Sequence, residues 1–239
     1  MNLMISTIRC LLPCALVALA ACAPLPSQQT EYPVGRARLA LPPGAWQDLG
    51  AVDGAVALLP EVDGRIALQT RTVALRGAQQ ELLAVLRVQT NRTNDREWAV
   101  HWPASCQPQQ GVTVEDATKG DRVRVDCLRL KRWMHGSEWL EKNHPDFAQS
   151  LAWHKFALSM PHSFLSYRYA TAGGATVSVE ALVDQRLLTP RTRNNAEFLT
   201  AGRPALQWGR DLAQAARVSA GMMDGFLAIP PFPFSAPSS

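Results

Sequence analysis

Residues 164–183 read FLSYRYATAGGATVSVEALV, and this stretch decides the fold. Two runs rich in aromatic and β-branched residues, 164–171 and 175–183, flank Gly173-Gly174. A glycine pair between two strand-like runs is a strong signal for a β-hairpin. The stretch therefore predicts an antiparallel pair of strands.

The register of this hairpin follows from the chemistry of the paired side chains. A two-residue turn would place Arg168 opposite Val179, which mixes polar with apolar residues. A three-residue loop, 172–174, instead pairs Tyr167 with Val179 and Arg168 with Ser178. This arrangement separates a polar face from an apolar one, so we expect it, with one glycine in the left-handed region.

Residues 121–134 form the clearest long strand before the hairpin. Its apolar positions change parity at Cys127-Leu128. A strand with one buried face cannot change parity without an extra residue, so we expect a β-bulge or sharp twist at this dipeptide. The corrected register would gather four basic residues on the opposite face: Arg122, Arg124, Arg129 and Lys131.

Further elements are expected on both sides of these strands. Strands are predicted at 36–41 and in a hairpin of 55–59 with 65–75, while 79–90 fits either a helix or a strand. Helices are predicted at 137–158, with a break at Asn143-His144-Pro145, and at 204–222, where small residues favour close packing on a sheet.

Strands dominate the first 134 residues, and a helix, the hairpin and a final helix follow. This order predicts an α+β fold rather than alternating βαβ units. We expect an antiparallel sheet with hairpins, packed against two or three helices, with the C-terminal helix on the sheet.

The composition limits the class of protein. A chain of 239 residues, 47% of them hydrophobic, suits one large domain or two small ones. The formal net charge of +4 is mild, and no concentrated basic patch is evident, which argues against a nucleic-acid partner.

The N-terminus carries a targeting signal. Arg9 precedes a mostly apolar run, Cys10 to Ala21, which is too short to span a bilayer and is typical of a signal peptide. Leu19-Ala20-Ala21-Cys22 resembles the lipobox of bacterial lipoproteins. The resemblance implies cleavage before Cys22 and acylation of that residue by lipid chains such as palmitate. The alternative is ordinary secretion with cleavage after Ala23.

The resemblance also implies a location. In such lipoproteins an aspartate after the cysteine favours the inner membrane, whereas Ala23 follows here, so we expect an outer-membrane anchor facing the periplasm. The chain then divides into a signal peptide (1–21), a flexible tether (22–32), a single α+β domain (33–229) and a disordered proline- and serine-rich tail (230–239).

Two cysteines remain after the signal and the lipidated residue are set aside. Cys106 and Cys127 form an even pair in an oxidising compartment, so we expect a disulfide between them. Two free thiols and a redox pair are the alternatives, although no Cys-x-x-Cys motif supports the second.

No catalytic motif is present in the sequence. It contains no Gly-x-Ser-x-Gly, no His-Glu-x-x-His, no P-loop and no Gly-x-Gly-x-x-Gly. Ser137, His135 and Asp146 could be arranged as a hydrolase triad, but nearly any sequence offers such a trio. The histidines lack the spacing of a zinc site. We therefore expect no enzyme, no cofactor and no metal.

Tryptophans cluster near the basic strand. Trp133, Trp139 and Trp153, with Arg122, Arg124, Arg129 and Lys131, form a candidate surface for a protein partner. The alternative is core tryptophans beside a solvated strand face. The leading hypothesis is a non-enzymatic outer-membrane lipoprotein that binds a protein partner in the periplasm. The alternatives are an immunity lipoprotein that neutralises a periplasm-acting toxin and, less favoured, an envelope hydrolase.

Overall fold

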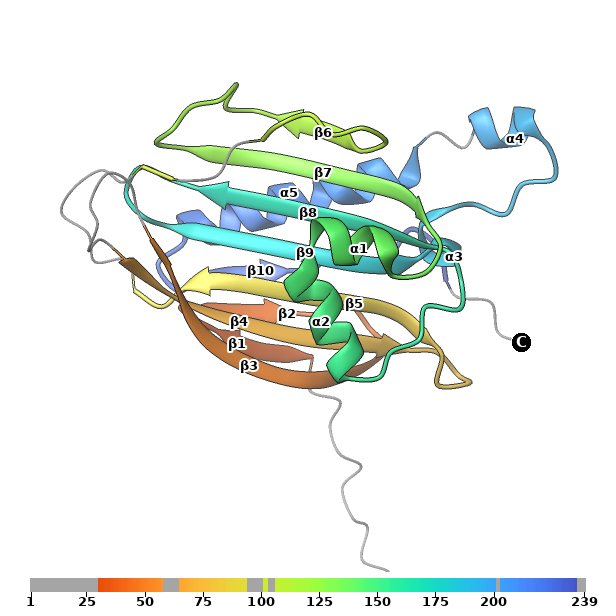
Figure 1. The fold of residues 1–239 in the computed structure, drawn as a ribbon, viewed down its shortest axis with the longest axis horizontal. Coiled ribbons are helices and arrows are strands. Elements are labelled where there is room, and N and C mark those ends of the chain that lie inside the picture. Colours follow the sequence, from red (N-terminus) through yellow and green to blue (C-terminus); the bar gives the residue numbers. More distant parts are fainter. Residues whose placement is uncertain (1–29, 58–64, 94–100, 103–105, 201–202, 236–239) are drawn as a thin grey trace, which may run out of the picture.

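A computed structural model describes residues 30–57, 65–93, 101–102, 106–200 and 203–235. One large sheet runs through the molecule, with a long helix behind it and two short helices in front (Figure 1). The predicted signal peptide, Cys22 and the turn at 60–64 lie outside the described residues.

The large sheet has seven strands in the order β3-β4-β5-β9-β8-β7-β6, and every neighbouring pair is antiparallel. Its strands are β3 (Ala45–Ala57), β4 (Arg65–Arg76), β5 (Leu82–Asn91), β6 (Thr113–Asp116), β7 (Val125–Met134), β8 (His162–Ala170) and β9 (Thr176–Asp184). The α+β prediction is confirmed, and most of the ambiguous segment 79–90 lies in a strand, β5, which begins at Leu82. β3 begins at Ala45, ten residues before the predicted start of this strand at residue 55, so it is longer than predicted.

The central hairpin has the predicted register. Tyr167 is opposite Val179, and Arg168 is opposite Ser178. The Thr171 amide donates to the Ala175 carbonyl at 2.9 Å, which closes the loop. Gly174 has φ +87°, a conformation that favours glycine.

The C-terminal helix α5 (Pro204–Gly221) lies on one face of the sheet, which we call the α5 face. A three-stranded sheet of β1 (Glu31–Val34), β2 (Ala37–Ala40) and β10 (Phe226–Ala228) covers the rest of this face. Together they bury the main apolar core. β10 pairs with β2 in parallel, so the two ends of the domain meet in this sheet.

Two short helices, α1 (Glu138–Asn143) and α2 (Pro145–Trp153), cover part of the opposite face, which we call the α1–α2 face (Figure 1). They are separated at His144, as the predicted break requires, and Pro145 is the first residue of α2. The helical region ends at Trp153 rather than at residue 158. Two further short helices, α3 (Gln185–Leu188) and α4 (Asn195–Thr200), were not predicted.

The β-bulge expected at Cys127-Leu128 is wrong. Strand pairing between β7 and β8 is continuous from Val125 to Lys131, and the register shift lies between Lys131 and Met134. Cys127 and Leu128 are both buried, each on a different face of the sheet, so both faces of β7 contribute to the core. The parity change therefore needs no extra residue.

Side chains compensate for the actual shift. The Arg132 carbonyl accepts a hydrogen bond from Ser163 Oγ at 2.7 Å and another from Gln185 Nε2. Both donors are buried. A buried carbonyl that leaves the ladder must find another donor, and these two side chains supply it.

The folded region extends beyond the predicted domain limits. β1 begins at Glu31, and Tyr32 is buried although it was assigned to the tether. In the predicted disordered tail, Phe232 stacks on Trp208 with 5.2 Å between ring centroids, and the Phe234 amide donates to the Leu187 carbonyl. No helix in the described ranges is long and apolar enough to cross a membrane.

The predicted disulfide between Cys106 and Cys127 is confirmed, with 5.6 Å between the Cα atoms. Cys127 is buried on β7, and Cys106 lies in the segment before β6. The bond therefore fixes that segment to the α1–α2 face of the sheet.

Candidate functional site

The register of the large sheet collects polar residues in the middle of the α1–α2 face. Directly opposite residues of an antiparallel pair share a face, so each row can be followed from strand to strand. One row runs Thr72, Arg87, Glu180, Ser166 and Arg129; the next runs Thr70, Gln89, Ser178, Arg168 and Cys127. We call the nine residues of these rows other than Cys127 the polar platform.

Apolar rows border the polar platform on both sides. On one side the row of Ala74, Val85, Leu182 and Phe164 packs against α1 and α2. On the other side Ile66, Leu68, Val125 and Ala170 pack around Trp102. The platform is therefore a polar strip between two apolar clusters, and its residues are half-buried.

An aromatic cluster positions the helices beside the platform. The His144 ring lies 4.4 Å from the Phe164 ring, between centroids, and Phe147 meets the same ring edge-on at 5.3 Å. Phe147 and Phe164 are fully buried. Burial of each such side chain contributes about 1.5–3 kcal/mol, so the junction between α1 and α2 is firmly attached to the sheet.

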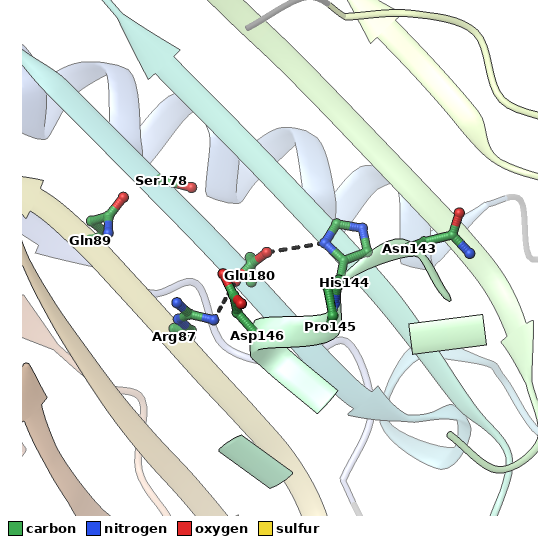
Figure 2. Close-up of a pocket in the computed structure, with 8 residues that line it drawn as sticks. All are labelled: Arg87, Gln89, Asn143, His144, Pro145, Asp146, Ser178 and Glu180. Atoms are coloured by element: carbon green, nitrogen blue, oxygen red, sulfur yellow. Dashed lines mark hydrogen bonds and ion pairs between the residues drawn. The ribbon is translucent and has the colours of Figure 1, made fainter. Parts of the chain in front are cut away.

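Glu180 is the centre of the charged part of the site. Its carboxylate lies 3.1 Å from His144 Nδ1 and 3.6 Å from Arg87 Nη1 (Figure 2). About a fifth of each of the His144 and Glu180 side chains is exposed, at 19% and 22%. The carboxylate is thus contacted from two elements, by Arg87 on β5 and by His144 at the start of α2.

A cavity of about 340 Å³ opens over this group. It is lined by Arg87, Gln89, Asn143, His144, Pro145, Asp146, Ser178 and Glu180 (Figure 2). Donors and acceptors are mixed in this lining, and no residue in it is a large apolar one. Small-molecule sites are mostly apolar with a few polar groups, so this cavity is better suited to a hydrated polar partner.

The segment before β6 contacts two residues of the site, Arg129 and Asn143. Arg129 donates from Nη1 to the Gln107 carbonyl at 3.0 Å and from Nη2 to Gln109 Oε1. Gln109 Nε2 donates to Asn143 Oδ1 at 2.6 Å. This chain of contacts connects β7 to the end of α1, so Arg129 is occupied by the protein's own groups.

Arg168 differs from its neighbours on the platform. Its Cζ lies 5.9 Å from the centre of the Trp102 ring, and Trp102 is itself buried and donates from Nε1 to the Thr171 carbonyl. Burial lowers the pKa of Arg168 from its usual value. Among the residues that the structure describes, none accepts a hydrogen bond from this guanidinium or forms an ion pair with it.

The structure separates the residues of the predicted partner surface. Arg129 and Lys131 share the α1–α2 face, where Lys131 Nζ lies 5.9 Å from the Trp139 ring centre. Arg122 and Arg124 are exposed and precede β7, and the seven residue-to-residue steps from Arg124 to Lys131 span about 23 Å of extended chain. The four basic residues therefore do not form one patch.

The three tryptophans also differ in their environments. Trp153 is 83% exposed and Trp133 is 51% exposed, whereas Trp139 is half-buried against the cluster under α1 and α2. Trp133 and Trp153 are thus available to a partner, and Trp139 contributes to packing.

The alternative chemistries considered from the sequence find no support in this geometry. Ser137 Oγ donates to Glu141 Oε1 at 2.6 Å, so the serine of the possible triad has another partner. In the described part of the chain, no three His, Cys, Asp or Glu side chains come close enough to hold a metal ion.

Sequence reasoning missed most of the polar platform. The available signal was the alternation in 82–91, where Arg87 and Gln89 interrupt a buried apolar run. The helix alternative for this segment obscured it. The signal in β9 was the alternation of Ser178 and Glu180 with the apolar residues Val177, Val179 and Ala181. It was used to set the hairpin register but not to locate a site.

Comparisons of this chain with family models, with curated proteins and with solved structures find no match.

Proposed function

We propose that this protein is a non-enzymatic lipoprotein, anchored to the outer membrane through Cys22, which binds a protein partner in the periplasm through its α1–α2 face. The observation that carries the binding role is the polar platform, a strip of charged and polar side chains over five strands that helices α1 and α2 leave partly exposed.

Two features support the envelope location. Leu19-Ala20-Ala21-Cys22 resembles a lipobox, and Ala23 follows it. The disulfide between Cys106 and Cys127 fits an oxidising compartment, because such bonds are rare in the cytosol.

Site-specific photocrosslinking in intact cells tests the binding role. A benzophenone amino acid replaces Ser178, which lines the cavity and therefore has space for a larger side chain. The matched control carries the same amino acid in place of Val218, a 45% exposed residue of α5 on the other side of the molecule. We expect a discrete protein adduct from position 178 and none from position 218.

The result also separates the possible roles. A secreted toxin in the adduct would identify an immunity lipoprotein, whereas a component of an envelope assembly would support a role in assembly or maintenance. Absence of any adduct from position 178, with the protein correctly folded, would overturn binding through this face.

A further inference from the structure

Three arginines lie on the polar platform, and two of them are neutralised or hydrogen-bonded within the protein. Arg87 pairs with Glu180, and Arg129 donates to Gln107 and Gln109. Arg168 is partly buried over Trp102, and within the described residues it has neither a carboxylate nor a hydrogen-bond acceptor. A guanidinium stays charged under these conditions, and removing it from water without a counter-ion is unfavourable.

The position of Arg168 relates this charge to the cavity. Ser178, which lines the cavity, is the residue directly opposite Arg168, and Gln89 is opposite Ser178 on its other side. The nearest carboxylate of the platform, that of Glu180, already contacts Arg87 and His144. The row that contains Gln89, Ser178 and Arg168 therefore offers hydrogen-bond donors, and the positive charge of Arg168 is not compensated within the described residues.

From this arrangement we infer that the platform binds an acidic side chain of the protein partner, with its carboxylate paired to Arg168. The inference rests on the proposed function. The Trp102 indole packs on the flat face of the guanidinium. The edge of the guanidinium, which carries its N–H groups, can therefore still donate two hydrogen bonds to one carboxylate. The cavity at Ser178, the residue opposite Arg168, has a mixed polar lining, which favours a peptide segment over a small free anion.

The test uses the purified full-length protein and two capped peptides, identical except that one has a central glutamate and the other a central glutamine. Binding is followed by NMR through the Nε–H signal of Arg168 and the indole N–H of Trp102. We expect a saturable shift with the glutamate peptide and binding at least about tenfold weaker with the glutamine peptide.

Variants of the arginine separate charge from geometry. Arg168→Gln should abolish the preference for glutamate, and Arg168→Lys should restore only part of it, because an ammonium lacks the planar fork. Arg124→Gln removes the same charge from an exposed position outside the platform, and it should leave binding unchanged. The wild-type titration alone decides the case if an Arg168 variant does not fold.

Two results would overturn the inference. Inorganic phosphate that binds as tightly as the glutamate peptide would indicate a general anion site, and equal affinity for both peptides would remove Arg168 from recognition. Either result, together with an adduct from position 178 in cells, would leave partner binding intact. Preference for glutamate without any adduct would instead overturn the proposed function.

Discussion

Tyr167 shows how a single residue couples the sheet to α5. It is fully buried, and its hydroxyl donates to Asp126 Oδ1 at 2.9 Å; Arg217 Nε donates to Asp126 Oδ2 at 2.8 Å. Burial chiefly, and the Asp126 charge in addition, raise the pKa of Tyr167 above its ordinary value of 10.0.

The raised pKa predicts a loss of stability in alkali. A group whose pKa is higher in the folded state stabilises fully below the unfolded pKa, and the contribution is lost as the pH rises above it. We expect the free energy of unfolding of the wild type to fall above pH 10 by up to about 1.4 kcal/mol per pH unit more than that of Tyr167→Phe.

Urea unfolding over a series of alkaline pH values measures this difference. At neutral pH, Tyr167→Phe should itself cost about 1 kcal/mol through the lost hydrogen bond. Asp126→Asn is the informative comparison, because it removes one cause of the raised pKa and leaves burial in place. Its stability should begin to fall at the same pH as that of the wild type, but the fall should end at a lower pH. If the free energy of unfolding falls equally with pH in the wild type and in Tyr167→Phe, the raised pKa of Tyr167 does not cause the loss of stability.

At the residue scale, the sequence is informative where side-chain chemistry is unambiguous. The pairing of Arg168 with Ser178 and of Tyr167 with Val179 was predictable, because only one register separates polar from apolar residues. The bulge at Cys127-Leu128 was not needed, because β7 is buried on both faces, and a strand's second face depends on elements far away in the chain.

At the scale of elements, the contact of α5 with the sheet depends on Gly209. A Cβ atom at this position would lie 2.5 Å from Leu165 Cδ1, and Leu165 is only 1% exposed. Alanine normally favours a helix by about 1 kcal/mol over glycine. Here the overpacking of a closely packed core outweighs that gain, because Leu165 has little space into which it can move.

We therefore predict that Gly209→Ala lowers the free energy of unfolding by about 1–2 kcal/mol. Gly221→Ala is the matched control, since it is the last residue of the same helix and a Cβ there would meet nothing within 4 Å. The control should be neutral or slightly stabilising. Chemical denaturation of both variants measures the difference, and a stabilised Gly209→Ala would refute the close approach.

Elements differ in how far they could be predicted. The long strands and α5 carry many residues of consistent pattern, so their positions followed from the sequence. β1 has only four residues, too few for a clear pattern, although it pairs with the neighbouring β2. β10 has three residues, and its pairing with β2 joins positions almost 190 residues apart, as with Phe226 opposite Arg38. No local pattern contains that information, and the packing of Phe232 on Trp208 was missed for the same reason.

At the scale of the whole molecule, the two faces of the sheet differ in the elements that cover them and in the contacts that hold those elements. Ion pairs attach α5 to the edge strand β6 and to its neighbour β7. Arg210 pairs with Glu115 on β6, and Arg217 pairs with Asp126 on β7. Arg36 donates to the Ala220 and Met222 carbonyls at the end of α5. Within the described residues, two short helices cover one part of the α1–α2 face, and Trp102 and the segment at Cys106 cover another. The half-buried polar platform lies between them.

The anchor decides where this surface can act. If Cys22 carries the lipid, Cys22→Ser should move the protein from the membrane fraction to the soluble fraction, because each buried CH₂ contributes about 0.8 kcal/mol and two or more chains hold a protein stably. Sedimentation of membranes after an alkaline wash measures the change. Cys106→Ser is the control, since it removes the disulfide and should leave the membrane fraction unaltered. Pelleting of Cys22→Ser like wild type would exclude lipid as the anchor, whereas a soluble wild type would favour secretion with cleavage after Ala23.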